Sequence, residues 1–77
     1  MSKSRLIPII NRLQAMQEDQ GEMIQVRKFE LDGQEKCLVT YDQKKEIFTL
    51  DDYVTKQTYQ FDNIDFTAIE ILELLQN

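Results

Sequence analysis

Few residues of this chain could do chemistry. Histidine is absent from its 77 residues, which removes the most common general base near neutral pH, every Ser-His or Cys-His nucleophile pair and the most common zinc ligand. Cys37 is the only cysteine, and its place in an alternating strand pattern predicts a packed small hydrophobic side chain rather than a reactive thiol. With Gly21 and Gly33 as its only glycines, the chain has no glycine-rich phosphate loop.

Two pairs of carboxylates, Asp51 with Asp52 and Glu70 with Glu73, are the remaining candidates for acid–base catalysis or for a hard metal ion. Adjacent residues of a strand point to opposite faces, which separates the first pair. The second pair has the spacing of a solvated strip on an amphipathic helix. The sequence therefore predicts a protein that is not an enzyme, with no catalytic, cofactor-binding or metal-binding residues and no cofactor.

The length and the net charge of the chain further limit the class of protein to which it can belong. A chain of 77 residues is expected to form one domain, residues 1–77, that buries only about 60–65% of its unfolded surface and so has a thin core. Nine basic and fourteen acidic residues give a net charge of −5, which opposes a phosphate backbone, so we expect no nucleic acid partner. The single cysteine and the lack of a long apolar run predict a cytoplasmic protein without a membrane segment.

The N-terminal segment predicts an amphipathic helix from Leu6 to Gln17, because its apolar residues recur at helical spacing. Ser4 is positioned to cap the start of this helix, and Gly21 to stop it. We expect the apolar stripe of this helix to pack on a β-sheet, as does that of a second helix at the end of the chain.

Alternating segments predict that sheet. Asp32-Gly33 between two of them is typical of a two-residue hairpin. The short connections indicate an antiparallel meander, because a parallel pair needs a crossover of a dozen or more residues. The strands are expected at Met23 to Leu31, Glu35 to Tyr41, Glu46 to Val54 and Thr58 to Asp62.

The first strand changes phase along its length. Ile24 and Val26 alternate with polar residues, whereas Phe29 falls on the opposite phase. This pattern predicts a β-bulge near Arg27 and Lys28. In the second strand, one face is expected to enter the core; its residues are Cys37, Val39 and Tyr41.

The last segment, Asp65 to Gln76, predicts a helix with an apolar arc wider than half of its circumference. Thr67, Glu70 and Glu73 are expected to form its polar strip, and Asp62 and Asp65 to cap its start. Either the first helix or a second copy of the chain must cover the apolar excess. The candidate interface residues are Ile64, Ile69, Ile71, Leu72, Leu74 and Leu75.

These elements predict an α+β fold, α-β-β-β-β-α, in which a four-stranded antiparallel meander carries the N-terminal and the C-terminal helix on one face. The segment 61–65 running into 68–75, together with Arg12-Leu13-Gln14 and the Asp32-Gly33 hairpin, resembles the YkuJ-like family of small uncharacterised proteins of low-GC Gram-positive bacteria. The resemblance implies a central antiparallel sheet flanked by helices. It implies no activity, cofactor or catalytic residue that could be transferred to this chain.

The function that this sequence favours is that of a small protein-interaction or regulatory module that is homodimeric and acts by binding a protein. One alternative is small-ligand binding in a cleft between the first helix and the sheet. Another is weak binding of single-stranded nucleic acid by the open sheet face, with Tyr41, Phe48 or Tyr59 as stacking residues. That open face is expected to be mixed rather than basic; it should carry Lys36, Leu38 and Thr40.

Overall fold

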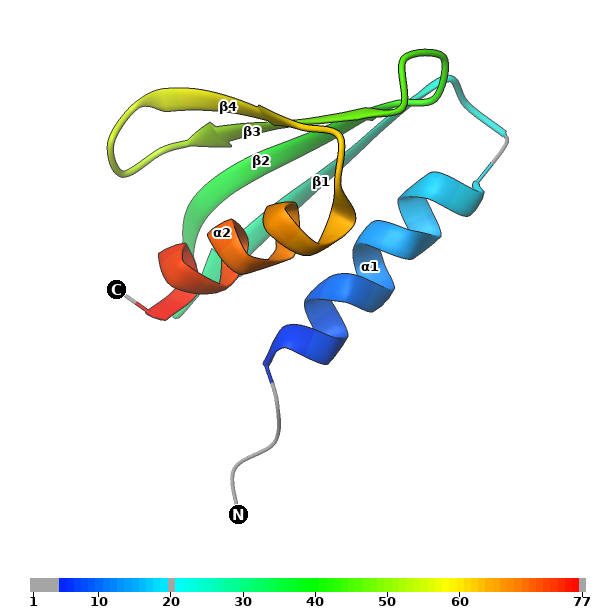
Figure 1. The fold of residues 1–77 in the computed structure, drawn as a ribbon. Helices are drawn as coiled ribbons and strands as arrows, with labels where there is room; N and C mark the ends of the chain where they lie inside the picture. Colours follow the sequence, from blue (N-terminus) through cyan, green and yellow to red (C-terminus); the bar gives the residue numbers. More distant parts are fainter. Residues whose placement is uncertain (1–4, 20, 77) are drawn as a thin grey trace.

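The computed structural model describes residues 5–19 and 21–76 of the chain (Figure 1). Their order is helix, four strands, helix, as the sequence predicts, and each element begins and ends within one or two residues of its expected bounds. The elements are α1 (Leu6–Glu18), β1 (Ile24–Leu31), β2 (Gln34–Asp42), β3 (Ile47–Asp52), β4 (Gln57–Phe61) and α2 (Ile64–Gln76).

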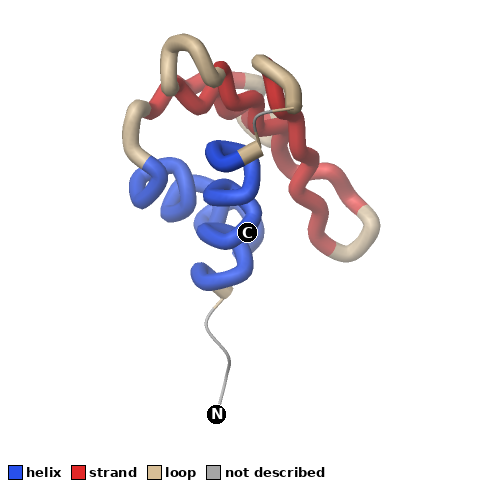
Figure 2. The backbone as a smooth tube through the Cα atoms, turned by 90° about the vertical axis from the view of Figure 1, so that its right-hand side faces the viewer, coloured by secondary structure: helices blue, strands red, loops and turns tan. Residues whose placement is uncertain are grey.

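The four strands form one antiparallel sheet in the order β1-β2-β3-β4. Helix α2 lies across this sheet and contacts all four strands, while α1 packs against α2. Figure 2 shows both helices beneath the same side of a curved sheet. The predicted meander with two helices on one face is confirmed.

The core lies between the sheet and the two helices. Tyr41 of β2 lies opposite Phe48 of β3, with ring centroids 4.6 Å apart, a distance typical of favourable aromatic pairs. The core face predicted for β2 is confirmed, since all three of its residues are buried. The other buried apolar residues are Ile9, Leu13, Met16, Phe29, Leu50, Ala68, Ile71 and Leu74.

Local chemistry fixes the three turns of the sheet. Asp32 and Gly33 both have positive φ, 53° and 80°, as the predicted type I′ hairpin requires. The other two turns share one construction, in which the last strand residue, Asp42 or Asp52, accepts hydrogen bonds from the amides two and three residues later. Such aspartate turns hold the chain in a tight reversal.

The end of α1 differs from the prediction. Ser4, expected to cap the helix, lies outside the described residues. Gly21 does not provide a left-handed stop, because positive φ occurs at Gly33 alone among the described glycines. Instead, the backbone leaves the helix at Asp19, which is extended and whose Oδ1 accepts the amide of Gly21 at 2.9 Å.

A distant side chain satisfies the carbonyls at this end of α1. Gln43, in the β2–β3 turn, donates its Nε2 hydrogens to the carbonyls of Met16, Gln17 and Asp19 at 3.2, 2.9 and 2.8 Å. Helix termini leave their last carbonyls without intrahelical partners. The turn therefore fixes the C-terminal end of α1 against the sheet.

The predicted position of the β-bulge was wrong. The pairing of β1 with β2 is regular through Arg27 and Lys28 and shifts only after Phe29. Lys36 of β2 is the residue that this shift leaves without a Cα partner. The prediction failed because the change of phase arises from two apolar residues at the start of β1 that are exposed on the open face, and not from a shift in the pairing of the strands.

Candidate functional site

The six predicted interface residues do not share one environment. Ile71 and Leu74 belong to the core, and Ile64, Leu72 and Leu75 are half-buried against it. Ile69 alone among the six is exposed, by 44%. The sheet on one side and α1 on the other therefore cover most of the apolar arc, which leaves little of it for a partner.

The polar strip predicted for α2 also differs from the observed one. Thr67 is fully buried, and its hydroxyl donates to the carbonyl of Asn63 at 2.8 Å. It lies four and seven residues before Ile71 and Leu74, on the side of the helix that faces the sheet. Phe66 instead faces solvent, with 64% of its surface exposed.

The start of α2 explains this orientation. Asn63 is the capping residue, and its Oδ1 accepts the amides of Asp65 at 2.7 Å and Phe66 at 3.2 Å. The sequence assigned this role to Asp62 and Asp65. Asp65 is instead the acidic residue of the first turn, where it interacts favourably with the helix dipole.

The exposed side of α2 carries two apolar side chains among acids. We define the α2 outer face as Phe66 and Ile69 with Asp65, Glu70 and Glu73. Residues 62–76 contain four acids and no lysine or arginine. The α2 outer face is therefore apolar at its centre and negative at its rim.

A cavity of about 340 Å³ adjoins this face. Phe66 forms one of its walls, and the ends of β3 and β4 form the others. Its remaining lining residues are Ile47, Gln60, Phe61 and Asp62. An aromatic side chain at the edge of a hollow is the kind of feature that anchors protein interfaces.

The two adjacent aspartates point to opposite faces, as predicted. Asp51 accepts a hydrogen bond from the Thr58 hydroxyl at 2.8 Å on the open face. Asp52 is buried and accepts the amides of Val54 and Thr55 at 2.8 and 3.1 Å and the Thr55 hydroxyl at 2.9 Å. Burial alone would raise the pKa of the Asp52 carboxyl, but these hydrogen bonds outweigh it and hold that pKa below 3.8. Asp52 thus closes the β3–β4 turn.

This lowered pKa gives a pH prediction. Because the folded state favours the charged form, Asp52 stabilises the fold above the unfolded pKa of 3.8, and this contribution is lost as pH falls through the folded value. Asp52→Ala should lower the free energy of unfolding at pH 7 by about 1–3 kcal/mol and flatten its dependence on pH below about 4. Urea denaturation across pH 3–7 measures both effects, with Asp51→Asn as the charge-matched control. An unchanged pH profile in Asp52→Ala would contradict this role.

Cys37 is fully buried in the sheet. Burial first, and then the negative charge of Asp52, raise the pKa of its thiol to about 12, against a weaker opposing effect of Arg12. The thiol is therefore protonated at neutral pH and packs as a small apolar group, as expected. Within residues 5–19 and 21–76, no group of three or more acids or thiols could hold a metal ion. No helix in the same ranges is long and apolar enough to span a membrane.

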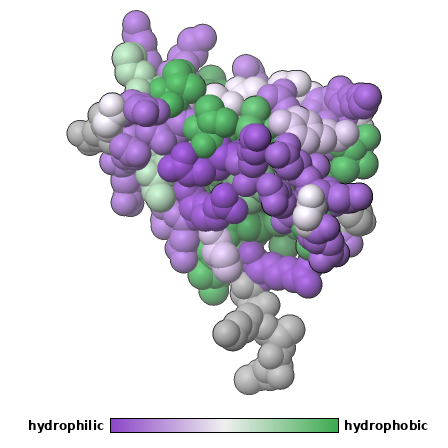
Figure 3. Space-filling view, turned by 180° about the vertical axis from the view of Figure 1, so that it is seen from behind, coloured by the Kyte–Doolittle hydropathy of each residue, from purple (hydrophilic) through white to green (hydrophobic). Residues whose placement is uncertain are grey.

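The open face of the sheet is mixed, as predicted. Its predicted residues on β2 are half-buried rather than buried, and β1 adds Ile24 and Val26, which are 46% and 45% exposed. Seen from behind, hydrophobic groups lie scattered among hydrophilic ones (Figure 3). Tyr41 and Phe48, two of the stacking residues considered for nucleic acid, are buried in the core. This face therefore lacks aromatic platforms from those two residues.

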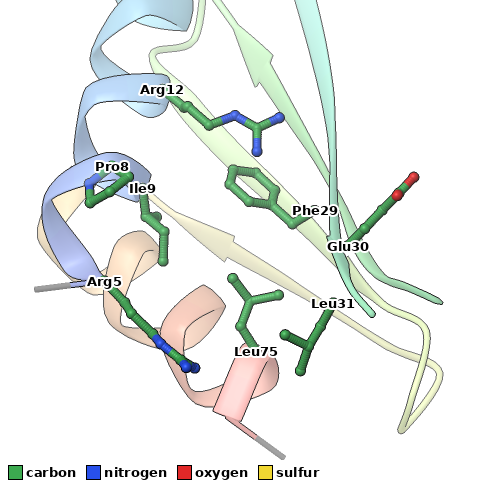
Figure 4. A pocket seen from close by; sticks show the side chains of 8 residues that line it. All are labelled: Arg5, Pro8, Ile9, Arg12, Phe29, Glu30, Leu31 and Leu75. Carbon is green, nitrogen blue, oxygen red and sulfur yellow. The ribbon is translucent and has the colours of Figure 1, made fainter. Parts of the chain in front are cut away.

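A second cavity, of about 260 Å³, lies between α1 and β1 and is closed at one end by α2 (Figure 4). We refer to it as the α1–β1 cavity. The ligand-binding alternative in the sequence analysis placed a cleft between the first helix and the sheet, but it did not name the residues of that cleft. The lining consists of Arg5, Pro8, Ile9, Arg12, Phe29, Glu30, Leu31 and Leu75.

Arg12 is held in place at the wall of this cavity. Its Cζ lies 4.3 Å from the centroid of the Phe29 ring, and its Nη2 donates to the carbonyl of Lys28 at 3.1 Å. The stacking on Phe29 is a cation–π contact. Sequence reasoning missed the role of Arg12, because its contact with a residue 17 positions away in another element has no local signal. It missed Phe66 because it placed the cap of α2 at Asp62 and Asp65 rather than at Asn63.

The fold and these surfaces define a small α+β protein in which two helices cover one face of an antiparallel sheet. The chain belongs to the family described as "Protein of unknown function (DUF1797)", which matches residues 9–75. It is 44% identical over 79 residues to the uncharacterized protein YkuJ of Bacillus subtilis (strain 168), across 95% of this chain and 99% of that protein. The X-ray structure of YkuJ from Bacillus subtilis matches with a TM-score of 0.88 and 42% identity, over 96% of this chain and 100% of that one. The expected family and fold are confirmed, and the function of the family is unknown.

Proposed function

We propose that this protein is a non-enzymatic protein-interaction module whose α2 outer face binds a basic, amphipathic segment of another protein. One observation carries the proposal. Phe66 and Ile69, 64% and 44% exposed, lie three residues apart and so share one side of α2. An exposed aromatic and an aliphatic side chain at helical spacing are the usual anchors of helix-in-groove recognition.

The charge around these two residues specifies the chemistry of the partner. Asp65 and Glu70 flank them, and residues 62–76 contain no lysine or arginine. A partner with lysine or arginine beside its apolar residues would complement this rim. We expect such charges to increase the association rate and to make binding sensitive to salt.

The negative charge of the α2 outer face disfavours a homodimer that uses this face. A second copy that docked on this face would bring two acidic rims together, and like charges across an interface cost several kcal/mol. Self-association stays a prediction, but we infer that it would use another surface. The α2 outer face is assigned to a different, basic protein. The location that we propose for the present chain is the cytoplasm, because its single cysteine is a free, buried thiol.

The size of the apolar pair limits the affinity. Full burial of two such side chains contributes about 3–6 kcal/mol, whereas association costs about 4–15 kcal/mol in lost freedom. Additional contacts in the adjoining 340 Å³ cavity and at the charged rim must supply the difference. We therefore expect a transient complex with a Kd on the order of micromolar.

A peptide titration tests the proposal. The probe is a synthetic helix with leucines at i, i+3, i+4 and i+7 and lysines on the flanking positions. We expect it to bind and to shift the NMR signals of Phe66, Ile69 and Glu70. Phe66→Ser and Ile69→Ser should each weaken binding about tenfold or more, because they remove an anchor residue.

The controls separate specific docking from general attraction to an acidic protein. Val54→Ser removes a side chain that is equally exposed but lies in the β3–β4 turn, and it should leave the affinity unchanged. A scrambled peptide of the same charge should bind much more weakly. The proposal fails if the scrambled peptide binds as well as the amphipathic one, or if the shifts map away from α2.

A further inference from the structure

We propose that the α1–β1 cavity is a binding site for a small amphipathic carboxylate, a molecule with an apolar body and one anionic head group. This site lies on α1, β1 and the end of α2, so it is independent of the proposed function of the α2 outer face. The observation that carries it is an apolar cavity of about 260 Å³ with two arginines in its lining.

The apolar part of the lining suits an aliphatic or aryl body. Ile9 and Phe29 are buried core residues, and Leu31 and Leu75 are half-buried at the cavity wall. Figure 4 shows these side chains converging from three different elements. The volume lies just below the range of about 300–1,000 Å³ typical of sites for drug-sized molecules, so the occupant should be small.

Arg12 supplies the contact for the head group, and Arg5, at the opposite end of the lining (Figure 4), adds positive charge to the cavity. Among residues 5–19 and 21–76 the ion pair is that of Lys28 with Glu35, so neither Arg5 nor Arg12 is paired with a carboxylate of those residues. Glu30 also lines the cavity, but its carboxylate points away from it (Figure 4). In a protein with a net charge of −5, two cations beside an apolar hollow favour an anion there.

Arg12 is preorganised for this role. Its stacking on Phe29 and its hydrogen bond to Lys28 use one face and one donor of the guanidinium. A guanidinium has five donors in a planar fork, so others are available for a carboxylate, which arginine binds in a bidentate manner. The protein would order this side chain before the ligand arrives, which lowers the cost of binding.

Titration with octanoate, followed by NMR, tests the assignment. We expect shifts at the methyl groups of Ile9, Leu31 and Leu75. Octanol and octylammonium have the same body with a neutral or a cationic head, and each should bind at least tenfold more weakly. Octyl phosphate tests the head group; if it binds more tightly than octanoate, the assignment to a carboxylate is overturned.

Three arginine variants locate the head group. Arg5→Gln and Arg12→Gln should each weaken octanoate binding about fivefold or more, whereas Arg27→Gln, which makes the same charge change outside the cavity, should not. Arg5 makes no packing contact like that of Arg12 on Phe29, so its variant tests charge even if Arg12→Gln is less stable. No binding of octanoate at millimolar concentration, equal binding of octanol, or shifts elsewhere on the protein would overturn the proposal.

Discussion

Replacement of Phe29 by alanine is expected to lower the free energy of unfolding by about 3–5 kcal/mol, the usual cost of removing a buried phenylalanine. Phe29 is among the largest fully buried side chains. Its ring also lies under the guanidinium of Arg12, so the substitution removes an additional contact between α1 and the sheet. A domain of this size has about 4–12 kcal/mol of stability in total, which makes this loss a large fraction of it.

Urea denaturation measures the effect, with Phe66→Ala as the matched control. Phe66 is the same residue type on the surface, and its loss should change the stability by less than about 0.5 kcal/mol. The midpoint should fall strongly in Phe29→Ala at a similar m-value. Equal losses in the two variants would contradict the described placement of both rings.

The second large effect is expected from Ile71→Ala, at about 2–5 kcal/mol. Ile71 is fully buried between α2 and the sheet, whereas Ile69, two residues earlier, is exposed. Both residues are interface candidates by sequence, so this pair separates a core residue from a surface one. Ile69→Ala should stay within about 0.5 kcal/mol of the wild type.

Thermal and urea unfolding of both isoleucine variants, each at several protein concentrations, complete this test. The loss in Ile71→Ala should not depend on concentration, because the residue packs within one chain. If Ile69→Ala proved the more destabilising variant, and only at high protein concentration, Ile69 would belong to a dimer interface. The assignment of the α2 outer face to a different protein would then be wrong.

Strong local patterns made the fold predictable. The alternation of Cys37, Val39 and Tyr41 gave the core face of β2, because residues two apart share one side of a strand. Asp32-Gly33 gave the first hairpin, since both of its residues have positive φ. Helical spacing gave both helices, and the short connections gave the meander.

Features that depend on packing between elements could not be predicted. Ile24 and Val26 are apolar, but β1 presents them to solvent, and the change of phase between them and Phe29 misled the bulge prediction. Gln43 caps a helix that ends 24 or more residues earlier, a contact without any local pattern. The sheet and α1 cover two different sides of α2, and this decides which of its apolar residues remain exposed. A helical projection of α2 alone does not show where these two neighbours lie.

The same reasoning explains the site. Thr67 appears polar in sequence, yet it is buried because its hydroxyl donates to the carbonyl of Asn63 within the helix. Phe66, the residue before it, faces solvent instead, although its side chain is aromatic. The start of the helix at the Asn63 cap sets this exchange. If the cap had been predicted at Asn63 rather than at Asp62 and Asp65, the sequence would have indicated which side of α2 faces solvent.

Site-specific photocrosslinking in living cells of the native host tests the central proposal most directly. A photoreactive amino acid replaces Ile69 on the α2 outer face, and the same residue at Val54 in the β3–β4 turn serves as control. We expect an adduct from position 69 alone, lost on Phe66→Ser, whose crosslinked peptide from another protein carries lysine or arginine beside helically spaced apolar residues. An adduct to a second copy of this chain, an equal adduct from position 54, or none at either position would contradict the account.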